Sequence, residues 1–240
     1  MSEDNNEIKE KRVLVLPGEL VGNKSMKIGN GAYYVGNDIY SYYMGIKSIK
    51  NNYVNVIPLK SKYFPNVGDI VIGTISEVAN SNWMVDINSI YPAFLHVNDV
   101  PWKIGKKELT EFLKMGDLVL AEVSHVDETK HITISMTKMG KVEKKKIESG
   151  ITITIPASKV PRVIGKSGSM ISMIKEYLNC RIIVGNNGVI WIDGKNIDEI
   201  SEAIHIIEII DSQAQRNGLT DTIKNILNNW KEQKMVKKNE

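Results

Sequence analysis

Hydrophobic residues change their spacing several times in the last third of the chain. The segment 151–155 alternates isoleucine with threonine, both β-branched, which is typical of a β-strand. Apolar residues then recur at helical spacing over 169–179 and again over 196–211, so each segment has one buried helix face. Between these helices, 180–184 and 189–192 are short apolar runs joined by Gly-Asn-Asn-Gly, which suits a tight turn. The pattern predicts a strand, a helix, two strands and a helix.

A two-glycine segment, Gly165-Lys166-Ser167-Gly168, separates the first strand from the first helix of this series, and we call it the GXXG loop. Because glycine has no Cβ, backbone N–H groups at the start of the helix can approach an anion closely. The alternative is a tight turn without any ligand. The loop predicts a phosphate clamp, and its candidate residues, with the neighbouring cations, are Lys159, Arg162, Ile164, Gly165, Lys166, Ser167, Gly168 and Arg181.

Short strands dominate the middle of the chain. Five strand-like runs are expected at 70–75, 83–87, 93–97, 116–123 and 131–135, which is the number found in an OB-type barrel. The first and fourth runs share a Gly-Asp-apolar opening. We therefore expect one barrel domain over residues 63–137.

The N-terminal part is also predicted to be β structure. It has short apolar runs at 13–16, 32–35, 39–44 and 53–57, which are separated by glycines, and no helix is predicted there. Its many tyrosines fit a small sheet or a partner surface better than base stacking. A segment of this size cannot bury all its apolar residues, which favours a docking surface. Residues 1–10 are polar and are expected to be mobile.

These patterns predict a multidomain chain that is mostly β with an α+β part. The expected domains are a small β domain over 1–62, the barrel over 63–137 and the α+β domain over 138–240. This last domain is expected to end in a further helix, with Thr220 as its N-cap, and a mobile tail from residue 231.

Charge is distributed unevenly, although the net charge is only +3. Residues 63–137 contain five Lys and Arg against ten Asp and Glu, whereas residues 138–240 contain seventeen against twelve. The basic excess therefore follows the GXXG loop, and the barrel is not a uniformly basic nucleic-acid surface.

The single cysteine, Cys180, excludes an internal disulfide and a zinc site built from several cysteines. No apolar run approaches the roughly 18 residues of a membrane span, and the first residues are too polar for a signal peptide. We expect a cytoplasmic protein without a metal or other cofactor.

No catalytic set is recognisable in the sequence. The four histidines are scattered, and the sequence contains no HExxH, P-loop or G-x-S-x-G motif. We therefore expect a protein that is not an enzyme.

The α+β part resembles a KH domain of eukaryotic-type topology, because it combines the GXXG loop with the predicted order of helices and strands. In KH domains this loop clamps the backbone of about four nucleotides. The barrel resembles an S1 domain in Val67-Gly68-Asp69, in Phe94-Leu95-His96-Val97 and in Ile132-Thr133-Ile134-Ser135. This second resemblance implies a single-strand RNA surface, and the residues that match it are Phe94, His96, Lys130 and His131.

The barrel departs from many S1 domains at two positions. Ser81 and Met84 stand where aromatic residues are common, and Trp83 is expected to point into the core. This departure, together with the acidic balance of the barrel, argues against strong RNA binding by the barrel alone.

Taken together, the domain order and the phrases Leu16-Pro17-Gly18-Glu19, Trp83-Met84-Val85-Asp86-Ile87 and Pro161-Arg162-Val163-Ile164-Gly165 resemble the archaeal-type exosome RNA-binding cap subunits with S1 and KH domains. The resemblance implies three copies on a hexameric ring of RNase-PH-like subunits. The cap would guide single-stranded RNA into the pore for 3′-to-5′ degradation or tailing. Two alternatives remain: a free-standing S1/KH regulator, or a fragment of a polynucleotide phosphorylase-like nuclease, in which the KH domain precedes the S1 domain.

Overall fold

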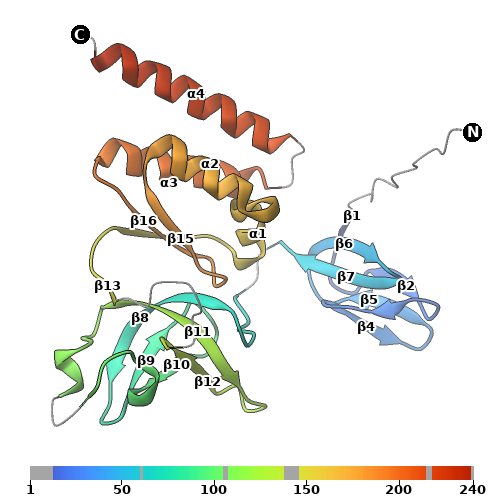
Figure 1. Ribbon diagram of the computed structural model, residues 1–240. Helices are drawn as coiled ribbons and strands as arrows, with labels where there is room; N and C mark the ends of the chain where they lie inside the picture. Colours follow the sequence, from blue (N-terminus) through green and yellow to red (C-terminus); the bar gives the residue numbers. More distant parts are fainter. Residues whose placement is uncertain (1–12, 60–61, 105–107, 138–145, 215–217, 239–240) are drawn as a thin grey trace, which may run out of the picture. The chain divides into compact units, whose positions relative to one another are not determined.

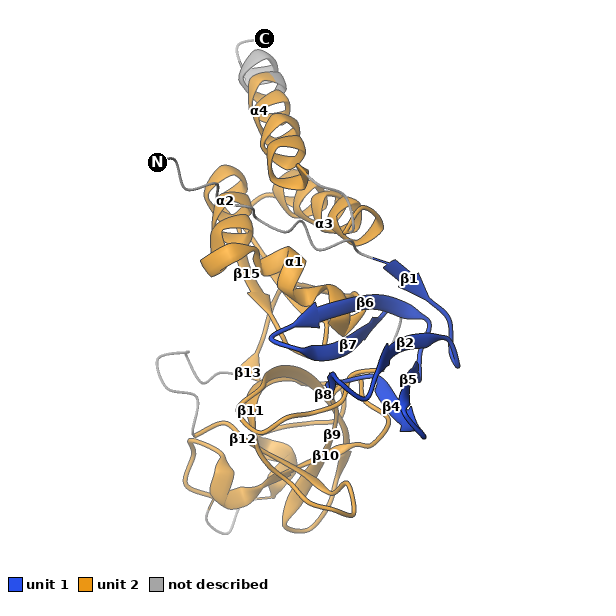
Figure 2. Cartoon of the chain, turned by 90° about the vertical axis from the view of Figure 1, so that its right-hand side faces the viewer, with its two compact units in different colours: residues 1–61 blue, residues 62–240 orange. Residues whose placement is uncertain are grey.

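The computed structural model describes residues 13–59, 62–104, 108–137, 146–214 and 218–238 (Figure 1). The chain divides into two compact units, residues 1–61 and residues 62–240 (Figure 2). The predicted mobility of residues 1–10 lies outside the described residues. No helix that the structure describes is both long and apolar enough to span a membrane.

Unit 1 is built from two small sheets, with strand orders β1-β6-β7-β3 and β2-β5-β4. Its core consists of Val15, Val21, Ala32, Ile39, Val54 and Val56. As expected, the described residues of this unit contain no helix. The strands are β1 (Val13–Val15), β2 (Leu20–Asn23), β3 (Lys27–Ile28), β4 (Ala32–Val35), β5 (Asp38–Ser41), β6 (Gly45–Lys50) and β7 (Tyr53–Pro58).

The predicted strand at 39–44 is wrong in its second half. The strand β5 ends at Ser41, and the chain turns before β6 begins at Gly45. The Ser41 hydroxyl donates to the Tyr43 carbonyl (2.6 Å) and accepts from the Tyr43 N–H (3.2 Å), so it stabilises the turn locally. The sequence pattern did not predict β2, β3 or β6, and β2 contains a glycine and an exposed leucine.

Unit 2 begins with a closed five-stranded barrel, as predicted. The strands are β8 (Ile70–Val78), β9 (Asn82–Asp86), β10 (Ala93–His96), β11 (Leu118–Val126) and β12 (Ile132–Ser135). They pair in the order β12-β10-β9-β8-β11, and a further pairing of β12 with β11 closes the barrel. Only the β10–β12 pair among these five strands is parallel. Two 3₁₀ turns, Val97–Asp99 and Leu109–Glu111, lie in the connection between β10 and β11.

Trp83 lies in the barrel core, which confirms the interpretation from the sequence. Its side chain is fully buried, and its indole N–H donates to the Leu113 carbonyl at 3.1 Å. The buried indole therefore keeps a hydrogen bond, which avoids the cost of an unpaired donor.

The α+β part follows the predicted order. Its elements are β14 (Ile151–Thr154), α1 (Val160–Ile164), α2 (Ser169–Leu178), β15 (Arg181–Val184), β16 (Val189–Asp193) and α3 (Ile197–Ser212). The antiparallel sheet has the order β14-β16-β15, and buried isoleucines of α2, β16 and α3 share one core. A short strand, β13 (Lys146–Ile147), pairs with β11 and leads from the barrel to this domain.

The last helix, α4 (Leu219–Lys238), corrects two expectations. It begins one residue before Thr220, because the Thr222 N–H already donates to the Gly218 carbonyl at 3.2 Å. It also continues through most of the predicted mobile tail. Lys231 lies 5.6 Å from the centre of the Tyr177 ring and Lys234 is ion-paired with Glu199, so contacts with α2 and α3 hold the later turns of the helix.

The turn between β15 and β16, which we call the GNNG turn (residues 185–188), packs on the barrel within unit 2. The Asn187 side chain donates to the carbonyls of Ile72 (2.8 Å) and Ile87 (3.0 Å), and it is fully buried. Next to it, the Asn186 N–H donates to the Ile70 carbonyl at 2.7 Å. A small apolar cluster of Ile72, Leu120 and Trp191 continues this junction.

Candidate nucleic-acid interface

The GXXG loop is shaped by two different glycines. Gly165 has φ 76° and ψ 177°, and a Cβ there would lie 2.6 Å from Met170 Cβ and 2.8 Å from Met170 N. Gly165 is therefore required by both backbone conformation and close packing against α2. Gly168 is also left-handed, with φ 79°, but a Cβ there would meet no atom within 4 Å.

The loop is open to solvent. Lys166 and Ser167 are exposed, and Ser167 has a left-handed φ of 52°. Within the described chain, the Lys166 ammonium has no ion-pair or hydrogen-bond partner. The segment that packs on the barrel is the GNNG turn instead. An exposed cation at an open glycine loop can accept a phosphate.

The remaining cations predicted for this site do not all gather at the loop. The Lys159 ammonium lies 2.6 Å from Asp211 Oδ1 and donates to the Asp211 carbonyl at 2.8 Å, so it fixes the end of α3. Arg181 is ion-paired with Asp193 and follows the far end of α2. A ten-residue helix is about 15 Å long, so Arg181 and the GXXG loop are distinct places on the surface.

Arg162 and Ile164 stay next to the loop because they belong to α1, which ends at Gly165. Both side chains are half-buried, and Ile164 packs against the core of the domain. The arrangement brings together Arg162, Ile164 and the four residues of the loop.

The barrel has an aromatic face made by β10 and the turn that precedes β12. The Phe94 and His131 rings are stacked, with centroids 4.4 Å apart and planes inclined by 11°. Phe94 is half-buried and His131 is exposed. A flat ring pair at the surface can accept an unstacked base.

The turn before β12 positions His131. The Asp127 carboxylate accepts hydrogen bonds from the Thr129 hydroxyl (2.7 Å) and from the His131 N–H (2.8 Å), and these bonds hold the Asp127 pKa below its usual range. Lys130 lies at the tip of this turn with φ 66° and is exposed. The ionised carboxylate therefore fixes the turn from which His131 reaches Phe94.

The other predicted barrel residue, His96, lies two positions after Phe94 on β10 and is half-buried, whereas the intervening Leu95 is fully buried. Across the strand pair, Met84 lies opposite Phe94 and Asn82 opposite His96. The four residues predicted for the barrel thus lie on one side of β10 and at the adjoining turn.

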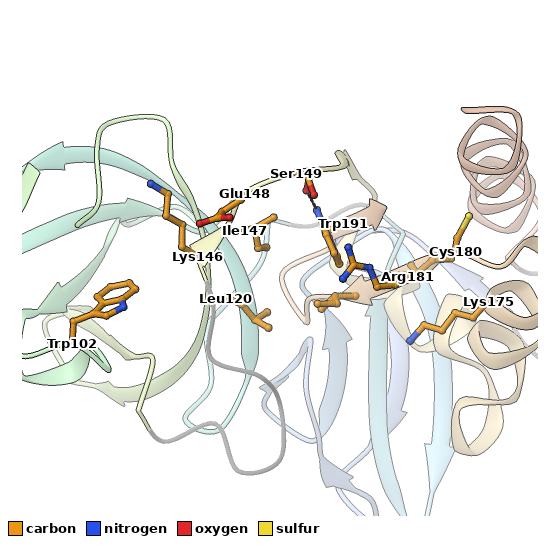
Figure 3. Close-up of a pocket in the computed structure, with 12 residues that line it drawn as sticks. Trp102, Leu120, Lys146, Ile147, Glu148, Ser149, Lys175, Cys180, Arg181 and Trp191 are labelled. Atoms are coloured by element: carbon orange, nitrogen blue, oxygen red, sulfur yellow. Dashed lines mark hydrogen bonds between the residues drawn. The ribbon is translucent and has the colours of Figure 1, made fainter. Parts of the chain in front are cut away.

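A cleft between the barrel and the KH sheet was missed by the sequence analysis (Figure 3). We call it the junction cleft. It has a volume of about 830 Å³, and its lining includes Trp102 and Leu120 of the barrel together with Lys146, Lys175, Arg181 and Trp191. No local motif marks it, because its residues come from segments far apart in the sequence.

A closed barrel with a stacked aromatic face, followed by a KH fold with an open GXXG loop, defines a multidomain protein of the S1 and KH class. Three family descriptions match successive segments of the chain: "Exosome RNA binding protein RRP4 N-terminal domain" over residues 12–60, "RRP4, S1 domain" over 62–125 and "KH domain" over 150–198. The chain belongs to the Rrp4 family of exosome components.

Relatives from archaea agree with this assignment. The chain is 45% identical over 215 residues to the exosome complex component Rrp4 of Thermoplasma volcanium, covering 89% of each chain. It is 40% identical over 222 residues to the Rrp4 of Picrophilus torridus, covering 92% of this chain and 95% of the relative. A crystal structure described as an exosome complex RNA-binding protein is 35% identical, with a TM-score of 0.64, over 74% of this chain and 99% of that one.

Proposed function

We propose that this protein is a non-catalytic cap subunit of the exosome that binds single-stranded RNA and guides it to the pore of a phosphorolytic RNase-PH-like ring. The observation that carries the proposal is the open GXXG loop in unit 2 of an Rrp4 family member, with Lys166 and Ser167 exposed. The stacked Phe94–His131 pair adds a base-binding face in the same unit.

The GXXG loop supplies the phosphate contact. The Ser169 N–H at the start of α2 donates to the Lys166 carbonyl, and Gly168 at the N-cap provides no side-chain cap for the N–H groups that follow. These groups, the positive end of the helix dipole and the Lys166 ammonium all favour an anion at the loop. Because Gly168 has open space around it, a sugar–phosphate backbone can approach closely.

The barrel face supplies base stacking rather than charge. Its region, 63–137, carries more acidic than basic residues, so phosphate attraction there is weak. Stacking on the Phe94–His131 pair is independent of that balance and tolerates any base. We therefore infer that the proposed binding has little sequence preference.

Docking on the ring is assigned to unit 1. Among the described residues, most of the exposed large apolar side chains belong to this unit: Val13, Leu14, Leu16, Leu20, Tyr34, Val35, Tyr42, Tyr43, Met44, Ile49, Tyr53 and Ile57. Such a density of exposed apolar groups in a small domain supports a protein contact. The resemblance to cap subunits implies three copies per ring.

The non-catalytic role rests on the family assignment, because the matching family descriptions are an RNA-binding N-terminal domain, an S1 domain and a KH domain. Turnover of RNA by the isolated protein with phosphate present would contradict this part of the proposal.

The proposed RNA contact is tested with a matched pair at Gly168. Asp and Asn have the same shape and both tolerate a left-handed φ, so Gly168→Asp and Gly168→Asn differ only in charge. We expect Gly168→Asp to bind single-stranded RNA at least about fivefold more weakly than Gly168→Asn at low salt, because it adds an anion at the phosphate position. Filter binding measures both variants, with thermal melts to show that they fold alike.

Equal RNA affinity of the two folded variants would overturn the phosphate clamp. Lys166→Gln provides a second test of the phosphate clamp, because it removes one cation from an exposed position. Its expected effect is a smaller loss of affinity and a slope of log affinity against log salt reduced by about 0.7, as for one contact to a single strand.

A further inference from the structure

The junction cleft lies where the barrel, the connector and the KH sheet meet, and the GXXG loop and the Phe94–His131 pair do not line it. Figure 3 shows Trp102 on the barrel side of the cleft and Lys175 and Arg181 on the KH side. Lys175 stands on α2, and Arg181 opens β15, which is an edge strand of its sheet. The cleft is therefore a composite surface that neither domain has alone.

Its lining carries more cations than carboxylates, and acidic residues beside the lining pair with two of the cations. Three cations, Lys146, Lys175 and Arg181, line the cleft with one carboxylate, Glu148. The Lys146 ammonium lies 2.6 Å from an Asp117 oxygen, and Arg181 is paired with Asp193. Each of these two cations already has an acidic partner.

Lys175 differs from the other two cations. Across the part of the chain that the structure describes, its ammonium has no ion-pair or hydrogen-bond partner. Neighbouring protein atoms partly remove water from the ammonium, and this desolvation lowers the Lys175 pKa. Lys175 is exposed, and an anion bound beside it would stabilise its charged form, so this unpaired lysine can take an anionic ligand.

The cleft also contains two indole rings. Trp191 is fixed, because its N–H donates to the Ser149 carbonyl at 2.5 Å and the Arg181 guanidinium lies 5.6 Å from its ring centre. Trp102 is half-buried, and its ring centre lies 6.0 Å from that of Phe112. An indole that keeps part of its surface exposed in the same cleft as the unpaired Lys175 can stack on a base.

We propose that the junction cleft is a further contact site for single-stranded RNA, with a phosphate at Lys175 and Arg181 and a base against Trp102. This inference rests on the proposed RNA-binding function and extends it to a separate place on unit 2. The volume is within the range of sites that hold small organic ligands, so it accommodates a nucleotide. The GXXG loop precedes α2 and the cleft adjoins its other end, so one strand following α2 would meet both.

The test uses the full chain and a matched pair of lysines. Lys224 is exposed on α4 and, like Lys175, has no partner among the described residues, so Lys175→Glu and Lys224→Glu make the same change in net charge. We expect Lys175→Glu to weaken oligoadenylate binding by about tenfold and Lys224→Glu by less than about twofold. Lys175→Ala should reduce the slope of log affinity against log salt by about 0.7, as expected for one contact to a single strand.

The outcomes separate this proposal from the proposed function. If the wild-type chain binds RNA and responds to the Gly168 pair, but Lys175→Glu equals Lys224→Glu, the cleft site is overturned and the proposed function stands. If the wild-type chain binds no single-stranded RNA, both the cleft site and the proposed function are wrong. If Lys175→Glu changes association with a protein partner while RNA affinity is unchanged, the cleft is a protein contact and the RNA site is wrong.

Photocrosslinking gives a reading that does not depend on variants. Thiouridine-containing RNA bound to the wild-type chain should form adducts on peptides that contain Trp102 or Arg181, in addition to adducts near the GXXG loop. Adducts confined to the loop and the Phe94–His131 face would overturn the cleft site.

Discussion

Asn187 holds both backbone polar groups of Ile72. Its amide N–H donates to the Ile72 carbonyl at 2.8 Å, and its side-chain oxygen accepts from the Ile72 N–H at 3.4 Å. Ile72 belongs to the barrel strand β8, and Asn187 to the GNNG turn of the KH domain. One buried amide thus completes the hydrogen bonding of a barrel strand from the neighbouring domain, which fixes the turn on the barrel.

The first prediction compares the two asparagines of that turn. Asn187→Ala leaves buried carbonyls of Ile72 and Ile87 without this donor, so we expect a loss of about 2–4 kcal/mol in the free energy of unfolding. Asn186→Ala removes bonds to the Ile70 N–H and Asp69 at an exposed position and should cost about 1 kcal/mol or less. Urea denaturation of both variants measures the difference. Similar losses would contradict the role assigned to the buried amide.

The second prediction concerns the two glycines of the GXXG loop. Gly165→Ala should destabilise the protein by about 3 kcal/mol, because its conformation is almost exclusive to glycine and the new Cβ would collide with Met170. Gly168→Ala should cost only about 1 kcal/mol, since its strain is that of a left-handed residue in open space. Thermal melts of the two variants test which loses more stability. If Gly165→Ala were as stable as Gly168→Ala, α2 would have to shift freely to make room for the new Cβ.

The third prediction isolates the aromatic face of the barrel. Phe94→Ala removes the ring that stacks on His131 and should lower affinity for single-stranded RNA by about tenfold. Phe64→Ala is the control, because Phe64 is an exposed phenylalanine of the same unit outside this face. Fluorescence anisotropy with a labelled oligonucleotide measures both. If the two changes have the same effect, the Phe94–His131 pair is not a base platform.

The fourth prediction is a pH dependence at Asp117. Burial raises the pKa of this carboxyl, but the Lys114 N–H (2.7 Å) and the Lys146 ammonium (2.6 Å) outweigh burial, and the pKa is lowered overall. A lowered folded pKa stabilises the protein above the unfolded pKa, near 4, and this stabilisation is lost as the pH falls through the folded value.

Asp117→Asn should therefore destabilise unit 2 by about 1 kcal/mol at neutral pH, with the difference shrinking below about pH 4. Glu128→Gln, an exposed carboxylate on the same barrel, is the matched control. Chemical denaturation across pH measures both variants. A difference for Asp117→Asn that stays constant down to pH 3 would show that the ion pair is not its source.

The fifth prediction concerns unit 1. Deleting residues 1–60 removes the exposed apolar side chains of β1 to β7 and should abolish association with the ring while unit 2 keeps its fold. Native mass spectrometry of each form mixed with ring subunits measures this. Undiminished assembly of the shortened chain would place the docking surface in unit 2.

Much of this fold follows from local pattern alone. The helical spacing over 169–179 gives α2, because burial of one face imposes a period of 3.6 on a helix. The alternation over 151–155 also gives β14, although only Ile153 of that strand is half-buried and its other residues are exposed. A period of two within β9 and β10 likewise buries Trp83 in the barrel and leaves Phe94 half-buried between the buried Ala93 and Leu95. Local pattern predicted element ends poorly. The strand β5 ends at Ser41, where a side-chain hydrogen bond to the backbone stabilises a turn. The helix α4 extends beyond its predicted end, where Lys234 forms an ion pair with Glu199 of another helix.

The candidate site was only partly within reach of the sequence. Lys159 and Arg181 lie near the GXXG loop in the sequence. In the structure Lys159 is ion-paired with Asp211, and Arg181 is ion-paired with Asp193. The junction cleft could not be predicted from the sequence, because Trp102 and Lys175 belong to different domains and line one cleft only after both domains have folded.

The sequence by itself determined the two Gly-x-x-Gly turns of this protein, at 165–168 and 185–188, because glycine spacing and flanking periodicity are local properties. Only the tertiary structure decided which turn faces solvent and which packs on the barrel. That choice depends on hydrogen bonds between Asn187 and barrel residues Ile72 and Ile87, at least 100 residues away. Such pairings depend on how two folded surfaces fit together, and no spacing within either turn encodes them.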